Sequence, residues 1–128
     1  MDLNSVDAVT IATAVRGRQV SAGEVVTATL NRIDKKDREL NCFTTVTRET
    51  ALADAAKIDE AIASGKDPGV LAGVPFAVKN LFDIAGITTL AGSKINAENS
   101  PATQDATAVA KLKQAGAILV GALNMDEY

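Results

Sequence analysis

The chain has 128 residues, of which 47% are hydrophobic and 23% are charged, a composition typical of globular proteins. Its net charge of −3 argues against a nucleic-acid-binding surface, so we expect no direct contact with nucleic acid. The sequence contains no histidine, which excludes a Ser-His-Asp triad and a histidine-ligated zinc site, and we expect neither a metal nor a cofactor.

Two helices are predicted at the start of the sequence. Either Asn4 or Ser5 caps the first, which covers residues 6–15. Ser21 begins the second, because Glu24 follows three residues later and completes a capping box.

A short strand and a third helix follow. Residues 41–46, NCFTTV, form a strand because β-branched and aromatic side chains dominate them. Thr47 caps the helix, which ends at Ser64. Its apolar residues recur at four-three-four spacing and share one face: Ala51, Ala55, Ile58 and Ile62.

The most informative stretch is a strand that starts at a Gly-Val-Pro turn, residues 73–75, and extends to Lys79. Both of its faces are apolar until the end, which is typical of a strand covered on both sides. Chemistry gathers at the carboxyl ends of such strands, where a desolvated, neutral lysine can act as a base. Lysines also end strands by extending the charged group into water, so position alone does not assign a catalytic role.

The last part of the sequence predicts a βαβ unit. Residues 93–103 are polar and lack periodicity, which indicates a lid or wall. Asp105 caps a fourth helix that continues to Ala115, and a second buried strand, AILVGA, covers residues 117–122. A helix between two buried strands is typical of a parallel sheet. Because two or three strands leave much of a sheet uncovered, we expect the chain to be part of a larger fold.

Two stretches of the sequence resemble the amidase signature family: GVPFAVKNLFDIAGITTLAGSK at residues 73–94 and DATAVAKLKQAGAILVGALNMDEY at residues 105–128. In that family a Gly-Val/Ile-Pro run leads to the catalytic lysine, and an Asp-Ala-Thr helix leads to a strand ending in Asn-Met-Asp-Glu. The resemblance implies an α/β fold with amino-terminal helices and the first strands of a mixed sheet covered by helices. Residues 1–70 would be the helical part of one amidase domain, and residues 71–128 the start of its catalytic α/β core.

The resemblance also implies amide hydrolysis by a Ser–cis-Ser–Lys triad. One serine attacks the carbonyl, the second relays its proton, and the lysine, which carries over to Lys79, is the base. The two serines belong to a Gly/Ser-rich segment expected beyond Tyr128, and the serines of this chain lie in other contexts. We therefore expect this truncated segment to be inactive alone and to have the remainder of the amidase domain as its partner.

Within the family, the sequences KNLFD, TTLAGS and GALNMDEY look most like the carboxybiuret hydrolase (allophanate-forming amidase) branch, which cleaves small linear amides of the urea or biuret type. Asn80 departs from many relatives, which have aspartate after the lysine. The alternative is the A subunit of glutamyl-tRNA amidotransferase, a glutamine amidase. Both branches work with a small helical partner subunit. An oligomer is also implied. A non-catalytic, truncated interaction module is a third reading.

Side chains that follow the ends of the two buried strands are candidates to bind the substrate. An alternative role for each is to satisfy backbone groups in a tight connection. The candidates are Asp83, Thr88, Thr89, Ser93, Asn124 and Asp126.

The sequence predicts a cytoplasmic protein that does not contact a membrane. No apolar stretch is long enough for a membrane span, and the amino terminus shows no secretory signal. The single cysteine, Cys42, cannot form an intramolecular disulfide and lies beside Phe43 in an apolar run, so we expect it to pack in the core.

Overall fold

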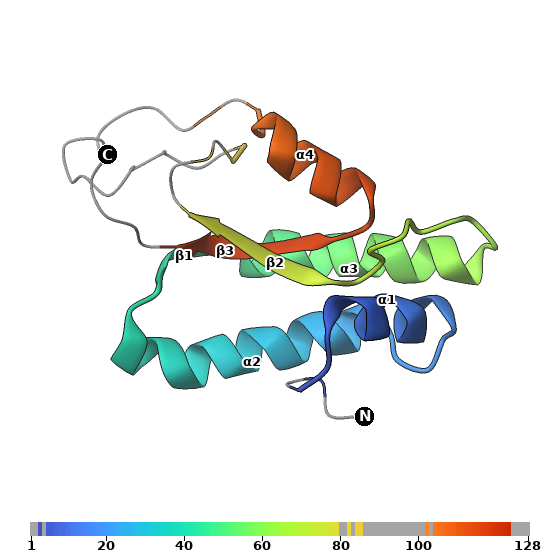
Figure 1. The fold of residues 1–128 in the computed structure, drawn as a ribbon, viewed down its shortest axis with the longest axis horizontal. Coiled ribbons are helices and arrows are strands. Elements are labelled where there is room, and N and C mark those ends of the chain that lie inside the picture. The colour runs from blue at the N-terminus through green and yellow to red at the C-terminus, as the bar shows by residue number, and fades with distance from the viewer. Residues whose placement is uncertain are drawn as a thin grey trace.

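A computed structural model of the chain describes residues 5–79 and 104–123, together with residues 3, 82, 84, 85 and 102. The described residues form seven elements of secondary structure (Figure 1): α1 (Ala8–Arg16), α2 (Ala22–Leu40), β1 (Phe43–Val46), α3 (Arg48–Ala63), β2 (Pro75–Lys79), α4 (Thr107–Gln114) and β3 (Ile118–Leu123). No helix among them is long and apolar enough to cross a membrane.

The strands of the described residues form one mixed sheet in the order β1-β3-β2. The central strand, β3, pairs parallel with β2 and antiparallel with β1. Lys79, the last residue of β2, lies opposite Leu123 in the parallel pair. Because α4 connects β2 to β3, the predicted βαβ unit is confirmed.

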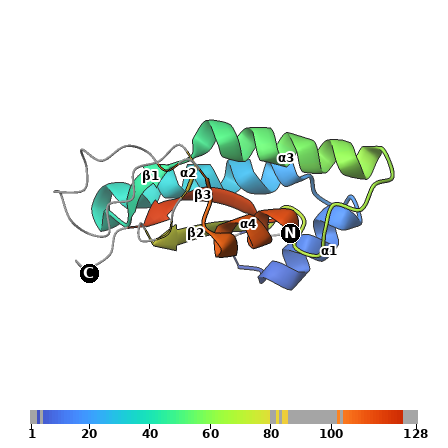
Figure 2. The same cartoon turned by 90° about the horizontal axis from the view of Figure 1, so that it is seen from above.

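Helices lie on both faces of this sheet. Figure 1 shows α1 and α2 on one side of the strands and α4 on the other. The third helix, α3, packs against α2 and β3, and Figure 2 shows α2 and α3 running alongside each other. The predicted α/β class, with amino-terminal helices and a mixed sheet, is therefore confirmed.

The larger apolar core lies between the sheet and the helices α1, α2 and α3. Its most buried side chains come from the three helices, from β3 and from the turn before β2: Val15, Ala22, Val25, Val26, Leu30, Ala51, Ala55, Ala72 and Ile118. The predicted apolar stripe of α3 is confirmed, because Ala51 and Ala55 are buried while Ile58 and Ile62 pack against the same core.

A smaller apolar cluster lies on the opposite face of the sheet. Ile84, Leu119 and Ala122 are buried in it, and Phe76 and Val78 of β2 pack against them. Because Ile84 comes after β2 in the chain, this cluster fixes a point just beyond Lys79.

The observed helix caps agree only in part with those predicted from the sequence. Ser21 caps α2 as predicted, since its side chain accepts a hydrogen bond from the Glu24 N–H. The first helix is capped by Asp7, not by Asn4 or Ser5. Hydrogen bonds from the Thr10 backbone and side chain lower the pKa of the Asp7 carboxyl.

Thr47 precedes α3, as predicted, but its hydroxyl does not cap the helix. The hydroxyl instead donates a 2.9 Å hydrogen bond to the Leu119 carbonyl of β3. This side chain therefore joins the start of α3 to the central strand, a connection that helix-capping rules do not anticipate.

The expectation that Cys42 packs in the core is wrong, because the residue is exposed. Asn41 ends α2 in the left-handed conformation with φ 49°, and the chain turns there before β1 begins at Phe43. The carboxylate of Asp37 accepts the backbone N–H groups of Cys42 and Phe43. Cys42 is thus a residue of this turn and not of the strand.

Candidate active site

Lys79 is placed by the strand that it ends. The side chains of Phe76 and Val78 pack on the smaller cluster and Ala77 on the larger core, so both faces of β2 are apolar, as predicted. The Lys79 side chain itself is exposed. Among the residues that the structure describes, its ammonium has no hydrogen bond or ion pair. The desolvation expected for a catalytic lysine would therefore have to come from groups outside this part of the chain.

The start of β2 is tied to the turn that follows α4. The Leu71 N–H donates a 2.8 Å hydrogen bond to the Ala115 carbonyl, and the Gly73 N–H donates a 3.0 Å bond to the Gly116 carbonyl. Gly116 has φ +96°, and a Cβ there would lie 2.3 Å from the Pro68 carbonyl oxygen. Only glycine fits this backbone-to-backbone approach without strain.

The chain just after Lys79 is held at three points. The Phe82 N–H donates a 3.2 Å hydrogen bond to the Lys79 carbonyl, which closes a turn at the strand end. Ile84 is only 4% exposed and lies in the smaller cluster. The Ala85 N–H donates a 2.9 Å hydrogen bond to Oδ1 of Asp105, which lies just before α4.

Asp105 is not the helix cap that the sequence predicted. The cap position of α4 belongs to Ala106, and no side chain bonds there. The carboxylate of Asp105 is occupied by Ala85 and by the Lys113 ammonium, which lies 2.8 Å from Oδ2. Burial raises the pKa of Asp105, but the hydrogen bonds from Lys113 and Ala85 outweigh it, so this pKa lies below its usual value.

Sequence reasoning missed this link because Ala85 precedes Asp105 by 20 residues. A weaker signal was present, since Lys113 follows Asp105 by eight residues, about two helical turns. That spacing allows an ion pair but gives no indication of the backbone group that shares the carboxylate.

The other predicted site residues cannot be compared with Lys79 in space. They all lie outside the described residues: Asp83, Thr88, Thr89, Ser93, Asn124 and Asp126. Among the described residues, no group of three or more histidine, cysteine, aspartate or glutamate side chains is arranged to hold a metal ion.

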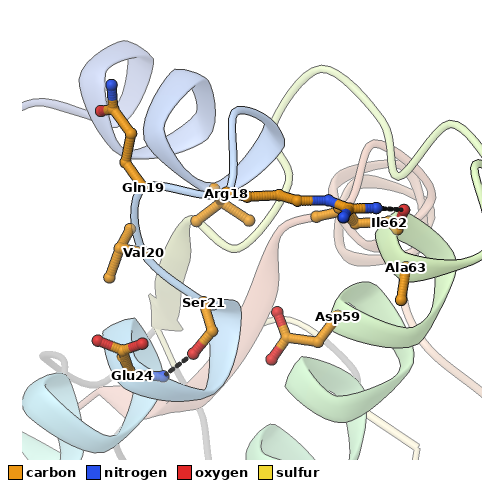
Figure 3. Close-up of a pocket in the computed structure, with 9 residues that line it drawn as sticks. Arg18, Gln19, Val20, Ser21, Glu24, Asp59, Ile62 and Ala63 are labelled. Atoms are coloured by element: carbon orange, nitrogen blue, oxygen red, sulfur yellow. Dashed lines mark hydrogen bonds between the residues drawn. The ribbon is translucent and has the colours of Figure 1, made fainter.

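A pocket of about 330 Å³ lies between the α1–α2 turn and the end of α3 (Figure 3). Its polar groups are largely used within the protein. The carboxylate of Asp59 accepts the N–H groups of Ala22 and Gly23, and Arg18 donates a 2.8 Å hydrogen bond to the Ile62 carbonyl. The pocket thus lies where hydrogen bonds join α3 to the α1–α2 turn and to the start of α2. It lies near the turn before β2, because a Cβ on Gly73 would lie only 2.9 Å from the side chain of Val15, which lines the pocket, and 3.3 Å from that of Ala22.

A protein-family model described as Amidase matches residues 24–128. The chain is 44% identical over 128 residues to the A subunit of the glutamyl-tRNA(Gln) amidotransferase of Carboxydothermus hydrogenoformans, an alignment covering 100% of this chain and 26% of that protein. It is 49% identical over 120 residues to the AtzE subunit of the 1-carboxybiuret hydrolase of Pseudomonas sp. (strain ADP), covering 94% of this chain and 26% of that protein.

The fold is also similar to a solved structure described as "An unexpected vestigial protein complex reveals the evolutionary origins of an s-triazine catabolic enzyme". The TM-score is 0.93 at 48% sequence identity, and the match covers 95% of this chain and 27% of that chain. The chain thus spans about a quarter of the length of the relatives that it matches.

Proposed function

Because the chain belongs to the amidase signature family, we propose that it is the amino-terminal segment of an amidohydrolase that cleaves a small linear amide of the urea or biuret type. The observation that carries the proposal is the position of Lys79 at the carboxyl end of β2, in a chain 49% identical to one subunit of a 1-carboxybiuret hydrolase. Residues 1–70 are the helical part of the domain, and residues 71–128 begin its catalytic core.

In the proposed mechanism, Lys79 is the base of a Ser–cis-Ser–Lys triad whose two serines lie outside these residues. The attacking serine bonds to the amide carbon while its proton passes through the second serine to the neutral lysine. The C–N bond then breaks and the amine leaves with a proton. Water attacks the resulting acyl-enzyme, which releases the acid and restores the serine.

The same proposal assigns a role to the side chains that follow β2 and β3. Chemistry gathers where parallel strands end, so these side chains line the substrate site in the complete domain. They are Asp83, Thr88, Thr89, Ser93, Asn124 and Asp126.

The partners in this proposal are the remainder of the amidase domain and a small helical subunit, within an oligomer. In the described sheet β1 and β2 each have one edge without a neighbouring strand, and further strands of the domain can pair there. The similar solved structure is described as a protein complex, which supports a second protein as partner.

A second candidate function is that of a glutamine amidase, the A subunit of a glutamyl-tRNA amidotransferase. It is favoured by the 44% identity to such a protein over all 128 residues. Both candidates use the lysine in the same way and differ in the amide that reaches it.

The experiment measures ammonia release by the whole protein that contains this segment, with 1-carboxybiuret, biuret and glutamine as substrates. Turnover of carboxybiuret or biuret that Lys79→Ala abolishes supports the first function. Turnover of glutamine alone, equally dependent on Lys79, supports the second. Absence of any lysine-dependent turnover would contradict both and favour a non-catalytic interaction module.

A further inference from the structure

We propose that Asp105 is a positioning residue for Lys79, because it holds the connection that follows β2 against the start of α4. The contact is the 2.9 Å hydrogen bond from the Ala85 N–H to the Asp105 carboxylate. This inference rests on the catalytic role proposed for Lys79 and adds a residue that does not touch the substrate.

The restraints on Lys79 are unequal on its two sides. Before the lysine, β2 is paired along its length with β3. After it, the described contacts are the Phe82 turn, the buried Ile84 and the hydrogen bond from Ala85. Since β2 is an outer strand of the described sheet, its end depends strongly on these few contacts.

Asp105 is suited to this task because it is itself held in place. Lys113, two turns along α4, lies 2.8 Å from its second oxygen. The side chains of Asp105 and Lys113 are 17% and 27% exposed, respectively. Those of the surface pair Asp34 and Arg48 are 54% and 43% exposed. Water screens a sheltered pair less, so loss of either partner disturbs it more.

The turn that follows the same helix is hydrogen-bonded to the chain just before β2. Hydrogen bonds join Leu71 and Gly73, just before the strand, to Ala115 and Gly116, just after α4. One helix is therefore tied to the chain on both sides of the strand that carries the lysine. Gly73 lies six residues before Lys79 and Ala85 six residues after it, so the two ties flank the lysine at equal separations along the chain.

A small displacement of the lysine would be costly for the reaction. A general base acts only within about 2.6–3.2 Å of the proton that it accepts. A misplacement of about 1 Å can reduce a rate about 100-fold. Loosening the connection after β2 should therefore reduce kcat more than substrate binding.

The test compares Asp105→Ala and Asp105→Asn with the control Asp34→Ala in the whole protein. Asp105→Ala removes both contacts and should lower kcat about 10- to 100-fold while KM changes less than about threefold. Asp105→Asn keeps an acceptor for the Ala85 N–H but loses the ion pair, so its loss should be smaller. Asp34→Ala breaks an ion pair on the surface and should leave kcat unchanged.

Hydrogen exchange at the Ala85 amide provides a readout independent of activity. Exchange should become faster in Asp105→Ala and stay unchanged in Asp34→Ala. Wild-type exchange or wild-type kcat in Asp105→Ala, in an enzyme that Lys79→Ala inactivates, overturns this inference and leaves the proposed function standing. If Lys79→Ala keeps its turnover, the proposed function and the positioning role both fail. Should Asp105→Ala not fold, Lys113→Met and Asp105→Asn decide the question, since each should lower kcat.

Discussion

The Asp59 carboxylate of α3 accepts a 2.7 Å hydrogen bond from the backbone N–H of Ala22, the first residue of α2. Its other oxygen accepts the Gly23 N–H at 3.1 Å, while Ser21 accepts the Glu24 N–H. A helix leaves its first N–H groups without partners inside the helix and carries a partial positive charge there. One side chain from a neighbouring helix therefore satisfies two of these donors and complements the charge.

Asp59→Ala should lower the free energy of unfolding by about 2 kcal/mol, because it removes two charge-assisted hydrogen bonds and leaves two donors without their partner. Ser21→Ala should cost about 1 kcal/mol, the usual effect of losing a cap. Urea denaturation of the wild type and of the two variants measures both changes in the free energy of unfolding. Glu60→Ala, at the exposed neighbouring position, is the control and should change stability by less than about 0.5 kcal/mol. Equal effects of Asp59→Ala and Glu60→Ala would contradict the prediction.

Local features of the fold could be predicted from the sequence. The cap at Ser21 depends on a donor three residues away, and the stripe of α3 on a repeating spacing within one helix. The βαβ unit followed from two apolar strands around a helix. The cap and the stripe involve groups that lie close in the chain, so a local pattern contains the information, whereas the βαβ unit follows from the type and order of its elements.

Contacts between distant segments could not be predicted in this way. Asp59 bonds to a residue 37 positions earlier, Asp105 to one 20 positions earlier, and Thr47 to one 72 positions later. Thr47 and Asp105 were predicted as caps for their own helices and Asp59 lies within α3, yet tertiary partners use all three side chains. The position of Lys79 at a strand end was predictable, whereas the described residues place no hydrogen-bond or ion-pair partner at its ammonium.

Gly116→Ala should reduce stability by about 3 kcal/mol or more, and Gly65→Ala by only about 1 kcal/mol. Both glycines have positive φ, +96° and +77°. A Cβ at Gly116 would lie 2.3 Å from the Pro68 carbonyl, whereas nothing lies within 4 Å of a Cβ at Gly65. Comparing the two variants separates the steric clash of the Cβ from the backbone strain at positive φ, and thermal denaturation measures the loss of stability in each. Similar losses for both variants would mean that the contact between residues 68 and 116 is not tight.

The Asp105 contacts should persist at neutral pH and weaken only in acid. Burial raises the pKa of this carboxyl, but the hydrogen bonds from Lys113 and Ala85 place it below the unfolded value of 3.8. The ionised group therefore stabilises the folded protein above pH 3.8, and this contribution is lost as the pH falls through the lower folded pKa.

NMR titration of the Asp105 carboxyl carbon measures this pKa, and Lys113→Met should raise it. Asp7 is an internal control in the same spectra, because its pKa is lowered by Thr10 and should not respond to Lys113→Met. A midpoint above 3.8 for Asp105 in the unmodified protein would show that burial dominates and that the two hydrogen bonds are weaker than inferred.

Lys79→Arg tests whether the lysine acts as a base or only as a cation. Arginine keeps the positive charge and a long apolar stem at the end of β2, but it stays protonated and cannot accept a proton. If Lys79 is the base, the variant of the whole protein should lose about 100- to 10,000-fold in kcat, the usual contribution of general acid–base catalysis. Lys66→Arg, at an exposed loop position, is the matched control and should retain the wild-type rate.

The fold should survive Lys79→Arg, because the Lys79 side chain is exposed and the strand before it is fixed by its apolar neighbours and by β3. Wild-type denaturation curves for the arginine variant would therefore assign the lost activity to chemistry. An arginine variant with most of the wild-type kcat would instead identify Lys79 as a structural cation. In that case the position of the side chain at the strand end would reflect the solvation of its charge, and another group would have to act as the base.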